Sequence, residues 1–249
     1  MKKGILECCV DSVESAINAQ RGKADRIELC ANLVIGGTTP TKSLFEEVRK
    51  HTDIKIHVLI RPRYGDFCYS EYEIEMIRRD IRLFSELGAD GIVLGTLNPD
   101  GTLNLPAMRM LISEAIGMSV TLHRAFDMCK DPFDTLENAI SLNIDTILTS
   151  GQENDCTKGA LMLQSLIQRA AGRIDILAGG GIEAEVIRKL YSITGCTSYH
   201  MSGKYILPSK MQYRNPNVNM GLPSLSEYEI YQTDESKIVS ARQVLDSLI

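Results

Sequence analysis

The sequence lacks the features that mark a nucleic-acid-binding or membrane-spanning protein. Its 27 Lys and Arg residues are outnumbered by 32 Asp and Glu residues, which gives a net charge of −5. A surface that binds nucleic acid needs an excess of basic side chains, so we expect no nucleic-acid partner. No apolar run approaches the roughly 18 residues that a membrane span requires, so we expect no membrane span either.

Cysteine pairs at the spacing of redox or zinc motifs are also missing. The chain has seven cysteines, an odd number, and none of them belongs to a Cys-x-x-Cys pair. This usage fits reduced thiols rather than a disulfide framework. The first residues are basic, but Glu7 interrupts any apolar core of a signal peptide. We therefore expect a cytoplasmic protein.

What the sequence does contain is a regular alternation of strand-like and helix-like segments. Amphipathic stretches such as 71–87 and 158–171 separate short apolar runs. Eight such units without a composition break predict a single-domain (β/α)8 barrel of the TIM type over residues 1–249. A doubly wound open sheet alternates in the same way and remains the alternative. The predicted strands are Ile5–Val10, Asp25–Leu29, Ile54–Ile60, Asp90–Leu94, Ser119–His123, Asp145–Thr149, Ile174–Ala178 and Ser198–Met201.

One segment departs from this alternation. Residues 203–234 are rich in Pro, Asn and Tyr and show no clear periodicity. We expect a long irregular loop there, followed by a closing amphipathic helix at 235–249. A connection of this length inside a compact domain usually has a function or covers something, so a lid and a dimer contact are both open.

Five titratable residues fall in, or at the end of, five different predicted strands. Such groups are costly to bury unless something pairs with them. In a barrel they would converge at the C-terminal mouth, where the sites of this fold are built. A carboxylate could act there as a general base and an imidazole as an acid. The candidate catalytic residues are Glu7, Glu28, His57, His123 and His200.

Residues at the ends of the strands could bind an anion. Gly179, Gly180 and Gly181 follow the seventh strand and precede a helix, and barrels commonly hold phosphate at loops seven and eight. Arginine side chains could add bidentate contacts. The other candidates for this anion or substrate site are Arg61, Arg63, Arg124, Ser150 and Ser202.

A metal ion is the other kind of ligand that the residues suggest. Imidazoles with carboxylates suit zinc, iron or copper, whereas thiolates select soft ions such as Cu(I). Several cysteines follow predicted strands, so the barrel would place thiols around one face. No motif with standard metal-ligand spacing is present, so the residues alone leave the metal open. The cysteines after strands are Cys30, Cys68, Cys129 and Cys156.

Five stretches of the chain are distinctive: ADRIELC at 24–30, IRPRYGDFCY at 60–69, HRAFD at 123–127, TSGQ at 149–152 and AGGGI at 178–182. Together they resemble the signature stretches of the CutC family, whose members are described as copper homeostasis proteins. The resemblance spans nearly the whole chain. It implies a TIM-type barrel, a cytoplasmic homodimer and copper handling, with Cys9 and Cys30 as the Cu(I) ligands.

Two functions therefore stay open. One is a copper homeostasis protein that takes up Cu(I) through Cys9 and Cys30. The other is an enzyme of unknown reaction that acts on a small anionic or carbohydrate-like metabolite at the barrel mouth. Acids, imidazoles and arginines are more than a Cu(I) carrier requires, because two or three thiolates would suffice.

Overall fold

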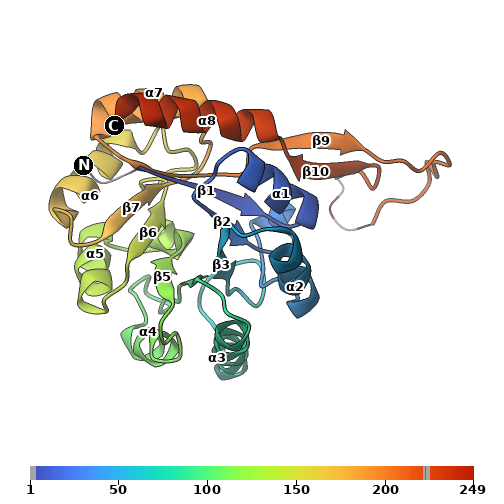
Figure 1. The fold of residues 1–249 in the computed structure, drawn as a ribbon. Coiled ribbons are helices and arrows are strands. Elements are labelled where there is room, and N and C mark those ends of the chain that lie inside the picture. The colour runs from blue at the N-terminus through green and yellow to red at the C-terminus, as the bar shows by residue number, and fades with distance from the viewer. Residues whose placement is uncertain (1–3, 221, 223–224) are drawn as a thin grey trace.

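The computed structural model describes residues 4–220, 222 and 225–249. Eight parallel strands pair in sequence order and close into a barrel, in which β8 pairs with β1 (Figure 1). This closure confirms the predicted (β/α)8 barrel and excludes the open doubly wound sheet. The barrel strands are β1 (Ile5–Val10), β2 (Arg26–Leu29), β3 (Lys55–Leu59), β4 (Gly91–Leu94), β5 (Ser119–Leu122), β6 (Thr146–Thr149), β7 (Asp175–Ala178) and β8 (Ser198–Met201).

Helices surround the ring of strands and bury its outer face (Figure 1). Within the described residues, none of the helices has the length and apolarity that a membrane crossing needs. The helices are α1 (Val13–Arg21), α2 (Lys42–His51), α3 (Glu71–Glu86), α4 (Leu105–Ile112), α5 (Pro132–Ser141), α6 (Ala160–Ala170), α7 (Ala184–Thr194) and α8 (Glu235–Leu248), with short 3-10 turns η1 (Leu33–Ile35) and η2 (Arg124–Met128).

Local signals explain where several elements begin and end. Ser70 and Glu73 form a reciprocal capping box at the start of α3, because each side chain bonds to the other residue's backbone N–H. Asp131 caps α5, and Pro132 occupies its first turn. Gly88 directly follows Leu87, the C-cap of α3, and has a φ of +79°, a left-handed conformation that favours glycine. The predicted strands agree with the structure in order and place, and differ by at most one residue at either end.

The strand registers stack the inward-facing side chains in layers. Successive side chains of a strand point to opposite faces. Because barrel strands are staggered, each layer takes one residue from every second strand. From the middle of the barrel toward the C-terminal mouth, the layers are Glu7, His57, Thr121 and Leu177, then Glu28, Val93, Leu148 and His200, then Cys9, Leu59, His123 and Gly179.

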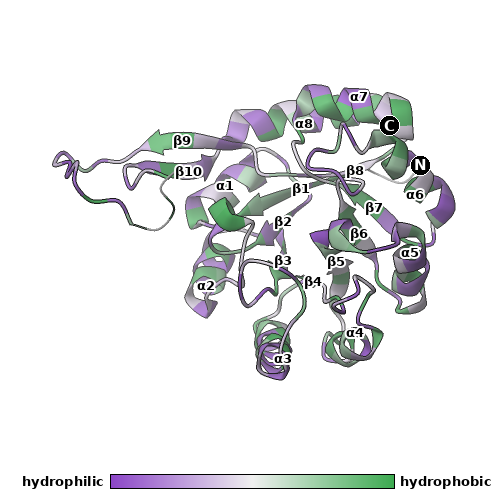
Figure 2. Ribbon diagram, turned by 180° about the vertical axis from the view of Figure 1, so that it is seen from behind, coloured by the Kyte–Doolittle hydropathy of each residue, from purple (hydrophilic) through white to green (hydrophobic). Residues whose placement is uncertain are grey.

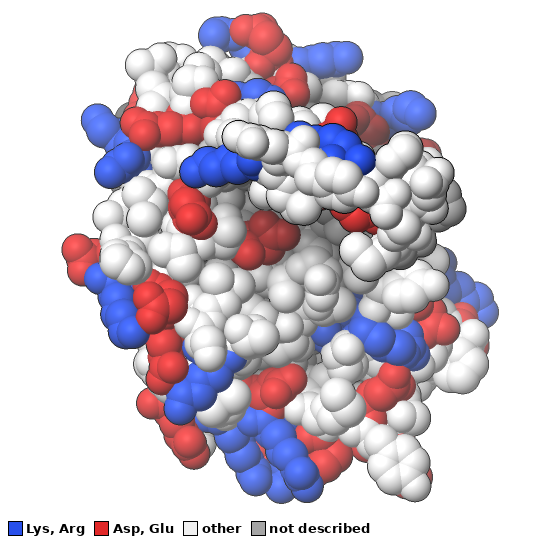
Figure 3. Space-filling view, turned by 90° about the vertical axis from the view of Figure 1, so that its right-hand side faces the viewer, with Lys and Arg blue, Asp and Glu red and all other residues white. Residues whose placement is uncertain are grey.

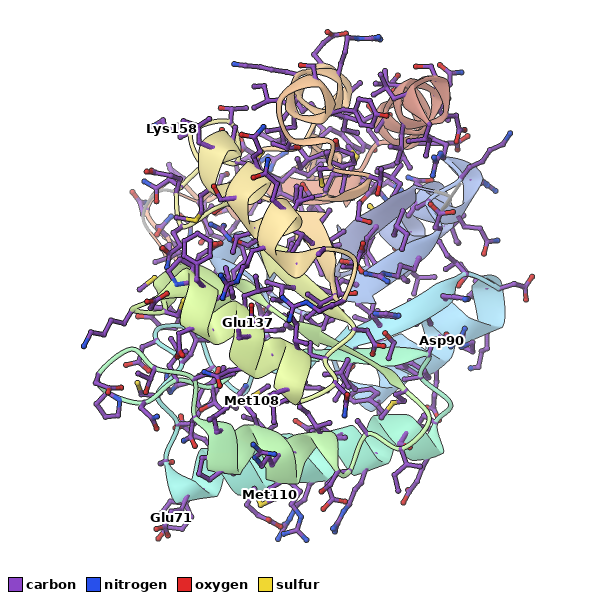
Figure 4. The ribbon with its side chains drawn as sticks, turned by 90° about the vertical axis from the view of Figure 1, so that its left-hand side faces the viewer. Glu71, Asp90, Met108, Met110, Glu137 and Lys158 are labelled. Carbon is purple, nitrogen blue, oxygen red and sulfur yellow. The ribbon has the colours of Figure 1, made fainter. Side chains whose placement is uncertain are left out.

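Aspartates immediately before β2, β4 and β6 hold the opposite end of the barrel together. Each carboxylate accepts the N–H of a residue at the start of the preceding strand. Asp90, for example, which is labelled in Figure 4, accepts the N–H of Ile56 at 2.9 Å and pairs with Arg49. The same contact joins Asp25 to Leu6 and Asp145 to Val120. This repeated device is visible in the sequence as an apolar residue and Asp before an apolar run, a repeat that the sequence analysis missed.

An arm projects from the barrel between β8 and α8 (Figures 1 and 2). Its base is an antiparallel pair formed by β9 (Lys204–Pro208) and β10 (Glu229–Thr233). The prediction of an irregular loop over 203–234 is therefore wrong at both ends of that segment. β9 and β10 pair only with each other and leave Ile206 and Ile230 exposed. Because neither strand has a fully buried face, the sequence shows no clear alternation of apolar and polar residues there.

Candidate functional site

A cavity of about 660 Å³ lies at the end of the barrel where the strands end. Figure 3 looks onto this face, which is hollowed near its centre and has acidic and basic side chains around the hollow. The structure thus brings together residues that are far apart in the sequence. The predicted residues that line the cavity are Cys9, Glu28, Arg61, His123, Arg124, Gly180, Gly181, His200 and Ser202.

Glu7 lies beneath this cavity and has no exposed surface. Its carboxylate accepts a hydrogen bond from Nε of Arg26 on β2 and contacts Nδ1 of His200 on β8 at 2.6 Å. Burial opposes ionisation, but Arg26 and His200 outweigh it and hold the pKa of Glu7 well below its usual range. Glu7 is therefore a buried anion with a cationic neighbour on each side.

His200 is the member of this group that reaches the cavity. Burial alone would lower its pKa, but the acidic groups of Cys9, Glu28 and Glu7 raise that pKa well above its ordinary value. Its Nδ1 then carries a proton and donates a hydrogen bond to the carboxylate of Glu7. The imidazole of His200 is a cation held at the floor of the cavity.

Glu28 belongs to the same layer as His200 and also lines the cavity. Its Oε2 is buried and has no hydrogen-bond partner among the described residues. Burial, with an addition from the negative charge of Glu7, raises the pKa of Glu28 to about 7, although His200 opposes the shift. A carboxyl group with this pKa can both accept and release a proton near neutral pH.

His123 is buried in the next layer toward the mouth. Its Nδ1 accepts the backbone N–H of Ala125 at 3.1 Å, so the neutral ring carries its proton on Nε2. Burial and the charge of Arg61 lower the pKa of His123 to about 3. His123 is therefore neutral near neutral pH and lacks the second ring proton that a general acid would release. The expectation of an acid at this position is not met.

The glycine-rich loop after β7 presents backbone N–H groups at the cavity. The N–H groups of Gly180 and Gly181 make no hydrogen bond within the described part of the chain, and α7 has no side-chain cap. Such groups attract anions. Glu183 and Glu185 line the same part of the cavity, however, and their negative charges oppose an anion there.

Arg124 reaches the cavity from η2 and is held by its neighbours. Its guanidinium donates to Asp127 at 2.6 Å and to the hydroxyl of Ser150 at 2.7 Å. The Ser150 hydroxyl is buried and donates to Asp127 or to the carbonyl of Glu153. Ser150 therefore does not line the cavity and instead positions Arg124.

Three other predicted residues do not line the cavity at the mouth. His57 lines a separate cavity of about 460 Å³ at the N-terminal end of the barrel. The stagger of the strands explains this error, because the register partner of Glu28 on β3 lies deeper in the barrel. Arg63 forms ion pairs with Asp66 and Glu73 outside the cavity. Gly179 serves packing, since an added Cβ would lie 2.6 Å from Cδ1 of Leu148.

Of the two cysteines implied as Cu(I) ligands, Cys9 lies on β1 and Cys30 directly follows the adjacent strand β2. Cys9 lines the cavity, whereas Cys30 is fully buried and packs with Leu59 and Val93. Burial and the nearby Cys9 and Glu28 raise the pKa of Cys30 well above its ordinary value. The other cysteines that follow strands, Cys68, Cys129 and Cys156, do not line the cavity.

Glu7, Glu28 and His200 also form a group with the composition of a metal site. Their candidate ligand atoms lie within 4.8 Å of one another, and no thiol-containing group of this kind occurs among the described residues. Arg26 and the His200 proton already compensate the carboxylate of Glu7. A divalent ion would have to displace that proton beside a fixed cation, so this donor set fits a metal poorly.

Sequence reasoning missed Arg26, the partner on which Glu7 depends. The signal was present, because Arg26, Glu28 and Cys30 alternate along β2 and so point to one side. It also missed Phe67, which lines the cavity from the loop after β3, and Lys237, which lines it from α8. No pattern in the sequence predicts which loop residues turn inward.

Comparison with known proteins places these features in a family. The model of the CutC family matches residues 4–205. The chain belongs to the CutC family. That match ends within β9, so most of the arm and α8 lie beyond it.

Full-length relatives extend this similarity through the arm. A family protein CutC from Parabacteroides distasonis is 46% identical over 238 residues, which cover 95% of this chain and 98% of that protein. The human copper homeostasis protein cutC homolog is 41% identical and covers 98% of this chain and 90% of that protein.

Known structures agree with the fold. The crystal structure of a CutC protein from Streptococcus agalactiae superposes with a TM-score of 0.76 at 29% identity, covering 80% of this chain and 98% of that one. A thiamine phosphate pyrophosphorylase from Pyrococcus furiosus has a TM-score of 0.59 at 15% identity, covering 98% of this chain and 96% of that one, a likeness that concerns the fold alone.

The raised pKa of Glu28 makes a prediction about stability. In the unfolded chain Glu28 has its ordinary pKa of 4.5, whereas in the folded state its pKa is about 7. Between these two pH values the folded state keeps a proton on Glu28 that the unfolded chain has already released. Wild-type stability therefore falls as the pH rises through that window. The Glu28→Gln variant cannot ionise there, so its free energy of unfolding should gain on the wild type by on the order of 2 kcal/mol between pH 4.5 and 8.

Urea unfolding at a series of pH values measures this difference. The exposed Glu86 supplies the control, because Glu86→Gln should follow the wild-type pH dependence. Parallel curves for wild type and Glu28→Gln would contradict the raised pKa.

Proposed function

We propose that this chain takes part in copper handling and binds Cu(I) through Cys9 and Cys30. The observation that carries the proposal is the pair of thiols on β1 and directly after β2, one at the cavity wall and one fully buried. They are close enough for the charge of Cys9 to raise the pKa of Cys30. Thiolates are the ligands that Cu(I) prefers, and the human and mouse relatives are named copper homeostasis protein cutC homologs.

The charges around the thiols support a cation. Glu28 and Asp11, with Cys9, raise the pKa of Cys30 because they repel a thiolate. The same negative groups attract a positive ion that takes the place of the thiol proton. Metal-free protein thus keeps the thiol protonated and inert, and Cu(I) binding releases the proton.

An anaerobic Cu(I) titration in competition with glutathione tests this site. The wild type should bind Cu(I) more tightly than glutathione does, and Cys9→Ser and Cys30→Ser should each weaken binding at least about tenfold, since one of two soft ligands is lost. Cys68→Ser is the matched control, because Cys68 lies outside the cavity. Equal affinities for all four proteins, or none tighter than glutathione, would end the proposal.

A second function is favoured by a different observation, the separation of protonation states in one cavity. Glu28 has a pKa near 7, His200 beside it stays protonated, and His123 stays neutral. Groups separated in this way perform general acid–base catalysis. We propose, as the alternative, an enzyme acting on a small anionic or carbohydrate-like metabolite, with Glu28 as base and His200 as acid.

A metabolite screen by thermal shift tests the alternative, since a specific ligand stabilises the fold by mass action. A compound that raises the melting temperature should be converted by the wild type. Glu28→Gln should lose at least about 100-fold in kcat while still being stabilised by the compound, because a general base contributes on that scale. Glu86→Gln should keep full activity. Undiminished turnover by Glu28→Gln would rule out this acid–base pair.

We propose in addition that the protein is cytoplasmic and forms a homodimer. Seven free cysteines, none in a disulfide, support a reducing compartment. The arm supports self-association, because it projects from the barrel and exposes apolar side chains that a partner would cover. These side chains are Ile206, Met211, Tyr213, Val218, Met220 and Ile230.

A further inference from the structure

Arg61 is a buried cation at the cavity that has no carboxylate partner. It is 8% exposed, and no Asp or Glu forms an ion pair with it among the residues that the structure describes. The other deeply buried arginines differ in this respect, since Arg26 pairs with Glu7 and Arg242 pairs with Asp25. Burying a charge without an opposite charge beside it is expensive, so this guanidinium favours an anionic ligand.

Backbone carbonyls fix the orientation of the Arg61 guanidinium. Its Nη1 donates to the carbonyls of Gly36 and Gly37 at 3.2 and 3.0 Å, and its Nη2 donates to Gly65 at 2.9 Å. Its Nε is buried and has no acceptor within the described residues. The Nε–H is therefore unused, and Nη2 makes one bond although it carries two N–H donors, so Nε and Nη2 can together grip a carboxylate with two parallel bonds.

His123 adds a second donor beside Arg61. It is 4% exposed, and its Nε2 has no hydrogen-bond partner among the described residues. Because Nδ1 is committed to the N–H of Ala125, Nε2 carries the proton and can only donate. A neutral, fixed donor next to a cation suits an anionic oxygen.

Phe67 covers both donors. Its ring centroid lies 4.7 Å from that of His123 and 5.1 Å from Cζ of Arg61. The carbonyl of Phe67 accepts bonds from the N–H of Leu97 and the hydroxyl of Thr96, so its backbone is held and only the ring can turn aside. The ring keeps water from the two donors, which strengthens any bond they make to a ligand.

We propose that Arg61 and His123 form a carboxylate-binding subsite in the cavity wall, and that the ligand of this cavity is a small organic acid. A planar carboxylate matches the free edge of Arg61 and leaves one oxygen for His123. A phosphate needs more donors than this corner supplies. The subsite rests on the alternative proposed above and gives it a substrate class. His123 lies one layer above Glu28 and His200, so the carbon chain of the bound acid extends over that acid–base pair.

Lactate and its uncharged analogue lactamide are matched probes for this subsite. In protein with ¹⁵N-labelled histidine, lactate should shift the His123 Nε2–H resonance in a saturable way, with a dissociation constant on the order of 1–10 mM. Lactamide should not. Arg61→Met should weaken lactate at least about tenfold. Arg63→Met, two residues away and paired outside the cavity, should bind lactate as the wild type does.

Other outcomes overturn the proposal. They are equal shifts with lactate and lactamide, undiminished binding by Arg61→Met, and a His123 signal that saturates with inorganic phosphate but not with lactate. If Arg61→Met does not fold, Arg61→Lys replaces it, because lysine keeps the charge but lacks the two-bond edge and should also weaken lactate.

This binding readout is independent of turnover and of copper. If lactate does not bind, the carboxylate subsite is rejected, and the Glu28→Gln kinetics still test the acid–base pair separately. If lactate binds but no bound compound is converted, the carboxylate subsite is supported and the proposal of an enzyme is rejected. The Cu(I) affinity of Arg61→Met should equal that of the wild type, because Arg61 is not among the thiol ligands.

Discussion

The cavity depends on one buried interaction, the carboxylate of Glu7 held between Arg26 and His200. A fully buried carboxylate without partners would take up a proton. Here two cationic neighbours on the flanking strands keep it ionised, and in return Glu7 helps to keep His200 protonated. His200 then lowers the pKa of Glu28, which burial raises, so the proton affinity of the whole floor follows from Glu7.

Closure of the barrel creates this interaction. Glu7 and His200 are 193 residues apart, and they meet because β8 pairs with β1 in register. The alternation of strands and helices was enough to predict the barrel and the inward direction of most site residues. It could not predict how far each strand slides along its neighbour. For this reason His57 on β3 lines the cavity at the other end of the barrel, whereas Arg61, two residues after β3, lies at the mouth.

Other parts of the site were beyond sequence reasoning for different physical reasons. The tautomer of His123 depends on a backbone N–H two residues on, and the isolation of Arg61 depends on which loops supply carboxylates. The tautomer of His123 and the lack of a carboxylate beside Arg61 both depend on tertiary contacts, which the sequence does not show. By contrast, two patterns are present in the sequence and could have been used for prediction. They are the aspartates that precede strands and the alternation of Arg26, Glu28 and Cys30.

Two chemistries share this cavity. The thiols of Cys9 and Cys30 offer soft ligands, whereas Glu28, His200, His123 and Arg61 offer charge and proton transfer, which Cu(I) does not use. Membership of the CutC family does not separate them, because family names describe homeostasis rather than a reaction. The charge state of the floor matters to both, since a protonated His200 beside Cys9 affects a metal and a substrate alike.

The most direct test of the central claim is the protonation state of His200, measured by ¹⁵N NMR of the ring nitrogens at about pH 8. An ordinary histidine, with a pKa near 6.5, is neutral at that pH. The Glu7 interaction predicts that His200 carries protons on both ring nitrogens whereas His57 and His123 do not, and that Glu7→Gln abolishes this state of His200. A neutral His200 in the wild type at that pH would contradict the account.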